Sequence, residues 1–156
     1  MSEVDFVCMA LLLLLGIPIV YCDLRHRIIP NILTYAGMLA GLAVLVVFRR
    51  PEFINYSLAF ILGFGVFYIL YMFGWIGGGD VKLMGMVGIL MGFPFLVNAL
   101  VYIALAGGLV GLAEIAVRAW RRQSLRGARI PYGTAIIAGC YYTAFQMLLM
   151  ETSGRY

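Results

Sequence analysis

Five stretches without a single charged side chain limit what this sequence can fold into more than any other feature. They cover residues 6–22, 28–48, 53–79, 83–113 and 130–150. A helix needs about 20 apolar residues to cross a bilayer, and a helix satisfies its own backbone hydrogen bonds there. Charged residues make up 12% of the chain, about half their share in soluble domains. We therefore predict an all-α polytopic membrane protein, with a single membrane-embedded domain over residues 1–156.

The number of membrane spans depends on the fourth stretch. Its 31 residues would form a helix of about 46 Å, whereas the hydrocarbon core of a bilayer is about 30 Å thick. Gly92 and Pro94 interrupt this stretch, because proline removes a backbone donor and disfavours helix in the residue before it. Six transmembrane helices are then expected, with a short fourth one, at about residues 5–22, 31–48, 56–75, 80–93, 97–117 and 132–150.

The distribution of basic residues favours six spans over five. With six spans, the loops at 23–30, 76–82 and 118–131 share one side of the membrane and carry eight lysines and arginines. The other side carries three, Arg49, Arg50 and Arg155, whereas the best arrangement with five spans gives seven against four. Cytoplasmic loops are enriched in basic residues, so we expect these three loops in the cytoplasm, both termini outside it, and an inner-membrane location.

Two of the seven acidic residues are candidates for a functional site. Asp23 follows the first span and Asp80 follows the third, so both emerge on the same face of the membrane with either count. An ionisable residue that borders a span is a functional candidate, because something has to offset its desolvation. Two structural alternatives stay open: Asp80 as the N-cap of the fourth helix, and Asp23 as a partner of the arginines that follow it.

Two carboxyl groups at such a border have a known chemistry when they lie close together. They hold one shared proton, because like charges a few ångströms apart do not both ionise. The ionised group can take a proton from the water that attacks a peptide carbonyl, while the protonated group polarises the carbonyl oxygen. The glycines at 77–79 fit this chemistry, since a backbone without side chains lets an extended substrate strand come close and add to it.

Three segments carry a family resemblance: DLRHRIIPN (Asp23–Asn31), GGGDVK (Gly77–Lys82) and IPYG (Ile130–Gly133). Together they resemble the signature regions of the type IV prepilin peptidases, membrane aspartic proteases that share a GxGD motif with presenilin-type enzymes. The resemblance implies an aspartic endopeptidase whose two catalytic residues are Asp23 and Asp80. It is closest to the short, peptidase-only branch of tight-adherence (Flp-type) pilus systems, without the methyl transfer of larger members.

The implied reaction is removal of the short cytosolic leader of a pilin-like precursor at the membrane border, after a glycine. No metal and no cofactor is expected to take part. We predict a substrate-binding role for seven further residues, drawn from the GGGDVK and IPYG motifs: Gly77, Gly78, Gly79, Lys82, Pro131, Tyr132 and Gly133.

Other functions and partners remain as alternatives. A non-enzymatic pilus-assembly factor, or a small transporter that couples the aspartates to ions or protons, would also need buried carboxylates. A membrane phosphotransferase would need several aspartates at helical spacing beside Mg²⁺, and no such pair is present. The basic segment 118–129 is typical of contact with anionic lipid headgroups and not with nucleic acid. GxxxG spacings favour close helix packing within the molecule, and leave a homodimer as an alternative.

Overall fold

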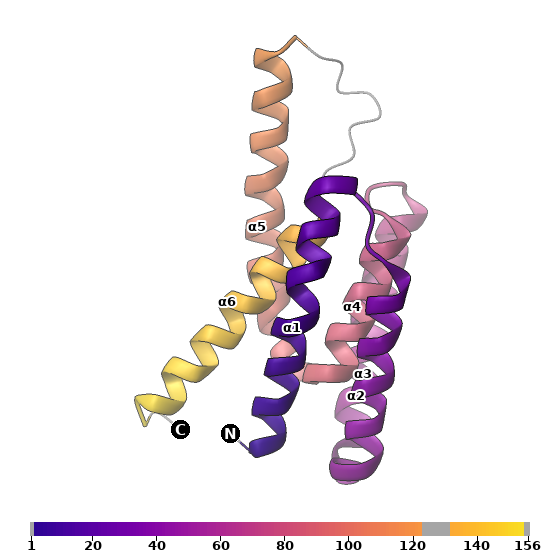
Figure 1. The fold of residues 1–156 in the computed structure, drawn as a ribbon, viewed down its shortest axis with the longest axis vertical. Coiled ribbons are helices and arrows are strands. Elements are labelled where there is room, and N and C mark those ends of the chain that lie inside the picture. The colour runs from indigo at the N-terminus through magenta and orange to yellow at the C-terminus, as the bar shows by residue number, and fades with distance from the viewer. Residues whose placement is uncertain (1, 123–131, 155–156) are drawn as a thin grey trace.

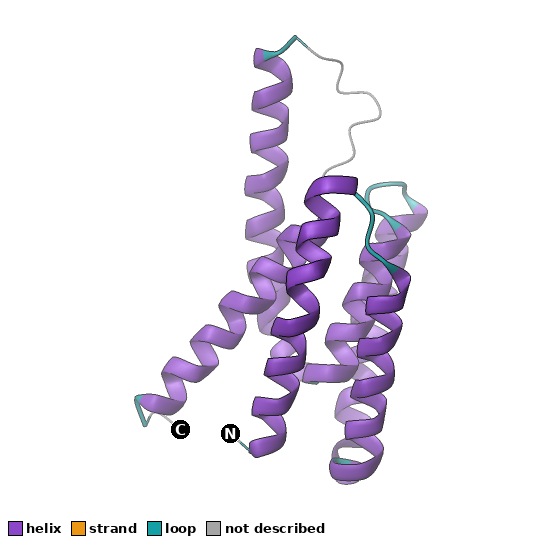
Figure 2. Cartoon of the chain, in the orientation of Figure 1, coloured by secondary structure: helices purple, strands orange, loops and turns teal. Residues whose placement is uncertain are grey.

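The computed structural model describes residues 2–122 and 132–154. These residues form six α-helices and one short 3₁₀ helix, and they contain no strand (Figures 1 and 2). The elements are α1 (Glu3–His26), α2 (Asn31–Phe48), η1 (Arg50–Glu52), α3 (Phe53–Met72), α4 (Gly78–Met91), α5 (Phe93–Trp120) and α6 (Tyr132–Thr152). The prediction of an all-α fold is confirmed.

All of the helices except α4 are long and apolar enough to cross a membrane, which makes this a multi-pass membrane protein. Helix α4 has 14 residues and is about 21 Å long, so the fourth helix is short, as predicted. Its last residue, Met91, is followed by Gly92, whose φ of 81° lies in a region that favours glycine. Helix α5 begins directly after Gly92. The predicted break in the long apolar stretch is therefore confirmed.

Other helices surround most of α4. Nine of its residues are buried, and it packs mainly against α3 and α2 (Figure 1). The helices approach so closely that a Cβ atom on Gly88 would lie 2.5 Å from the carbonyl oxygen of Ala59 in α3. A Cβ atom on Gly41 of α2 would lie 3.1 Å from the carbonyl oxygen of Ile89. The glycine spacings thus serve packing within the molecule at these contacts.

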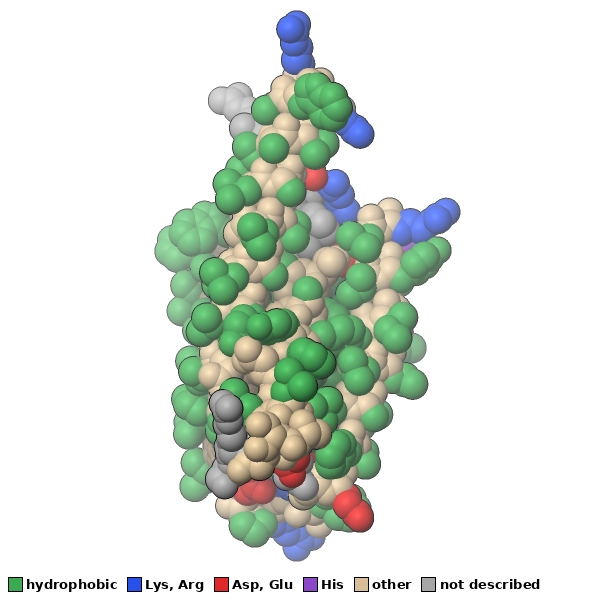
Figure 3. Space-filling view, turned by 90° about the vertical axis from the view of Figure 1, so that its left-hand side faces the viewer, with side chains coloured by type: hydrophobic (Ala, Val, Ile, Leu, Met, Phe, Trp, Pro, Cys, Tyr) green, Lys and Arg blue, Asp and Glu red, His purple; other side chains and the backbone are tan. Residues whose placement is uncertain are grey.

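The helices run so that one end of the bundle carries the start of α1 and the end of α6. The α1–α2 and α3–α4 connections lie at the opposite end (Figure 1). In Figure 3 hydrophobic side chains cover the flank of the molecule, and charged side chains lie mainly toward its two ends. This arrangement agrees with the predicted even number of crossings.

Of the three basic residues that run against the predicted charge asymmetry, Arg49 and Arg50 are described by the structure, and contacts with neighbouring groups account for both. Arg49 is 8% exposed, donates to the carboxylate of Asp5 in α1 and lies 5.1 Å from the ring centroid of Tyr56. Arg50 donates through Nε to the carbonyl oxygen of Val46 at 2.7 Å. Arg49 is therefore a neutralised structural residue that joins α1 to the start of α3, and it weighs little in the topology.

Candidate active site

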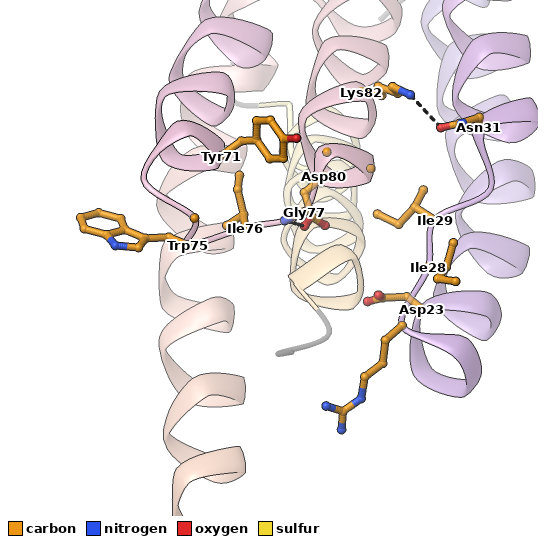
Figure 4. A pocket seen from close by; sticks show the side chains of 14 residues that line it. Asp23, Ile28, Ile29, Asn31, Tyr71, Trp75, Ile76, Gly77, Asp80 and Lys82 are labelled. Atoms are coloured by element: carbon orange, nitrogen blue, oxygen red, sulfur yellow. Dashed lines mark hydrogen bonds between the residues drawn. The ribbon is translucent and has the colours of Figure 1, made fainter. Parts of the chain in front are cut away.

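A cavity of about 610 Å³ opens at the end of the bundle where the α1–α2 and α3–α4 connections lie. Figure 4 shows it from close by. Its walls come from the end of α1, the two connections, and the first turns of α2 and α4. The lining residues are Asp23, Arg27, Ile28, Ile29, Asn31, Tyr71, Gly74, Trp75, Ile76, Gly77, Gly78, Gly79, Asp80 and Lys82.

Asp23 reaches the cavity from the last turn of α1 and is 4% exposed. Its Oδ2 atom accepts two hydrogen bonds from Thr134 in the first turn of α6, at 2.7 Å from the backbone N–H and 2.9 Å from the hydroxyl. Arg27 has its guanidinium 3.4 Å from Glu114 of α5. The carboxylate of Asp23 is thus held by the start of α6.

Asp80 reaches the cavity from the first turn of α4 and is 7% exposed. Its Oδ2 atom accepts a hydrogen bond of 2.9 Å from the backbone N–H of Gly77, the residue that caps the helix. A carboxylate in this position also interacts favourably with the helix dipole. Asp80 is therefore not the N-cap residue itself, which is Gly77, but its side chain caps the helix start from the third position and also lines the cavity.

The two carboxylates approach one space from opposite walls (Figure 4). Asp23 and Asp80 are 57 residues apart in sequence. Counting the membrane crossings between them predicted that both lie at the same end of the bundle. Within the described residues, the hydrogen bonds to each carboxylate use only Oδ2, so Oδ1 of each remains available for water or substrate. Two buried carboxyl groups with one available oxygen each are the minimum that an acid–base pair needs.

The three glycines before Asp80 form the start of α4. Gly77 caps α4, and Gly78 and Gly79 already belong to its first turn. A Cβ atom on Gly79 would lie 2.9 Å from Cβ of Ile29, whereas one on Gly78 would meet only the Tyr71 ring at 3.7 Å. Gly79 is therefore required by packing, while all three glycines line the cavity.

The remaining predicted binding residues fall in different places. Lys82 lines the cavity and donates through Nζ to Oδ1 of Asn31 at 2.9 Å. Gly133 is buried, and a Cβ atom on it would lie 3.1 Å from Oδ2 of Asp23. Tyr132 is not part of the lining, since its ring packs against Gly107 of α5. Pro131 lies outside the described residues, and the roles of all four stay predictions.

Comparison with known proteins places this chain in a family. The profile of the type IV leader peptidase family matches residues 7–112, which is more than half of the chain and includes Asp23 and Asp80. The chain belongs to the type IV leader peptidase family. A prepilin leader peptidase/N-methyltransferase of Myxococcus xanthus (strain DK1622) is 29% identical over 103 residues. That alignment covers 62% of this chain and 31% of the relative, so the chain spans about a third of that protein's length. No solved structure matches the chain.

Sequence reasoning missed two residues that shape this family member's site. Thr134 binds Asp23, and Ile29 packs between the helix starts that carry Gly79 and Gly133. A signal for Thr134 was present, because the last span begins on the same side as both aspartates and the first N–H groups of a helix lack partners within it. Nothing in the sequence indicated which side chain Ile29 would contact.

Proposed function

We propose that this protein is a membrane aspartic endopeptidase that removes the short leader of pilin-like precursors. The observation that carries the proposal is the pairing of Asp23 and Asp80 in one cavity at one end of the bundle. Membership of the type IV leader peptidase family, and the printed activity of the Myxococcus relative, support the same reaction. The resemblance of the three motif segments to tight-adherence systems supports an Flp-type precursor and activity without methyl transfer.

The reaction needs one proton on the carboxyl pair. The ionised group takes a proton from water as its oxygen attacks the scissile carbonyl, and the protonated group donates a hydrogen bond to the carbonyl oxygen. The tetrahedral intermediate then collapses as the leaving nitrogen gains a proton and the C–N bond breaks. Within the described residues, no group of three His, Cys, Asp or Glu side chains lies close enough to hold a metal ion. The absence of a metal from the reaction stays a prediction.

The charged residues around the cavity support cleavage at the membrane border. Arg27 at the end of α1 contacts Glu114 of α5 at 3.4 Å, and Glu114 pairs with Arg118 of the same helix at 2.7 Å. Ionised groups of this kind remain near water or headgroups. Asp23 lies four residues before Arg27 on α1, which is about 6 Å along the helix axis. The carboxyl pair therefore acts about one helical turn deeper in the membrane than these charged side chains. An inner-membrane location with the cavity toward the cytoplasm follows from the charge asymmetry.

The test is cleavage of a purified single-span precursor by the detergent-solubilised protein, followed by mass spectrometry of the product. We expect loss of a leader whose new N-terminus lies within about one turn of the start of the hydrophobic segment. Asp23→Asn and Asp80→Asn should each abolish cleavage, because the pair needs both members. Glu114→Gln is the matched control, since Glu114 does not itself line the cavity, and it should keep activity.

Three outcomes would contradict the proposal. Near-normal turnover in either asparagine variant would exclude the shared-proton pair. Loss of activity on adding a chelator would point to a metal. A product cut several turns inside the hydrophobic segment would refute the position of the site at the border.

A further inference from the structure

Asp23 is oriented by an element that lies 111 residues away in sequence. Both protons that Thr134 offers, one on the backbone nitrogen and one on the hydroxyl, point to the same oxygen of Asp23. Gly133 makes this approach possible, because a Cβ atom there would lie 3.1 Å from Oδ2 of Asp23 and 2.7 Å from Cδ1 of Ile29. The start of α6 is therefore built around this carboxylate.

The two aspartates are held in different ways. Asp80 takes its hydrogen bond from Gly77, within the same helix start, so α4 alone sets its orientation. Asp23 takes both of its hydrogen bonds from α6, so its orientation depends on how α1 and α6 pack. Two donors on one carboxylate oxygen restrict rotation of the carboxyl group and leave Oδ1 available to the cavity.

We propose that Thr134 is the positioning residue of Asp23, and that its hydroxyl keeps the carboxylate turned so that Oδ1 serves the reaction. The inference rests on the proposed function, and it assigns a role to α6, which lies beyond the residues that match the family profile. Thr134 does not line the cavity, so it acts through Asp23 and not on the substrate.

The hydroxyl can be tested separately from the backbone N–H. Thr134→Val keeps the backbone donor and nearly the same shape but removes the hydroxyl, and Thr134→Ser keeps the hydroxyl. A hydrogen bond to a charged group is worth about a factor of ten or more. We expect Thr134→Val to lower kcat on the order of tenfold, with KM changed by less than about twofold, because substrate contacts are untouched. Thr134→Ser should restore kcat to within about threefold.

Thr143→Val provides the matched control on the same helix. Thr143 is also buried, but its hydroxyl donates to the carbonyl oxygen of Gly139 at 2.9 Å, away from the cavity. The control should keep wild-type kcat. Wild-type kcat in Thr134→Val, or no recovery in Thr134→Ser, would overturn the inference while leaving the proposed function intact.

Failure of the wild type to cleave any precursor would refute the proposed function. A second measurement tests the role of Thr134 even in that case. Thr134→Val should lower the thermal unfolding midpoint in the Asp23 protein but not in an Asp23→Ala background, because the hydroxyl then has no carboxylate to bind. Equal shifts in both backgrounds would show that Thr134 only packs, and would overturn its role in positioning Asp23.

Discussion

Replacing Gly79 with alanine should damage the protein, although the same change at its neighbour Gly78 should not. A Cβ atom on Gly79 would lie 2.9 Å from Cβ of Ile29, and ordinary contacts begin at 3.4 Å, so one side has to move by at least 0.5 Å. The obstructing atom is attached directly to the backbone and cannot rotate away. A Cβ atom on Gly78 meets only the Tyr71 ring, at an ordinary 3.7 Å.

The expected stability change is the difference between two effects. Overpacking costs about 1–3 kcal/mol, while alanine in a helix is favoured over glycine by at most about 1 kcal/mol. Gly79→Ala should therefore lower the free energy of unfolding by up to about 2 kcal/mol, and Gly78→Ala should leave it unchanged or raise it. Because the displaced backbone carries Asp80, Gly79→Ala should also reduce cleavage on the order of tenfold.

The chain contains its own reporter for this measurement. Cys8 and Cys140 are buried, so a thiol-reactive fluorogenic dye will label them as the protein unfolds in detergent, once the more exposed Cys22 has been replaced by serine. The comparison can be made stricter at Ile29. Ile29→Ala keeps the obstructing Cβ atom and should not relieve Gly79→Ala, whereas Ile29→Gly removes it and should. Equal unfolding midpoints for the two glycine variants, or equal relief by both changes at Ile29, would refute the steric argument.

Two further predictions concern the packing that supports the site. Gly88→Ala should destabilise the protein by about 1–3 kcal/mol or more, because its Cβ would lie 2.5 Å from the Ala59 backbone oxygen, while Gly65→Ala, with nothing within 4 Å, should not; equal unfolding midpoints would contradict this. Arg49→Gln should lower the free energy of unfolding by about 1.5–3 kcal/mol through loss of the pair with Asp5, and an unchanged midpoint at low salt would show that this pair contributes nothing.

Helix positions, and which segments share one end of the bundle, could be predicted because they depend on properties that run along the chain. Uncharged length sets the spans, and the break at Gly92 follows from local backbone chemistry. Counting crossings is enough to place Asp23 and Asp80 at one end. None of these steps requires knowledge of which helices touch, so they succeed from one sequence.

The contacts of the charged side chains could not be predicted, because they depend on how the helices rotate and pack. The guanidinium of Arg27 contacts the carboxylate of Glu114, 87 residues away in sequence. Arg49, which follows α2, pairs with Asp5 at the start of α1, 44 residues away in sequence. In a membrane helix that is apolar all round, no polar face indicates which side will meet a neighbour, and close approach at glycines decides it.

The meeting of the three motif segments at one side chain gives a physical reason why they occur together. Ile29, from the first segment, packs against the start of α4 at Gly79 and against the start of α6 at Gly133. The residue after Gly79 is Asp80, and the residue after Gly133 is Thr134, which binds Asp23. A single buried isoleucine therefore sets the spacing between the two helix starts that orient the two carboxylates. The main role of Gly79 and Gly133 is therefore to let the two helix starts pack closely against Ile29. A change in any one of the three segments alters the geometry that the other two depend on.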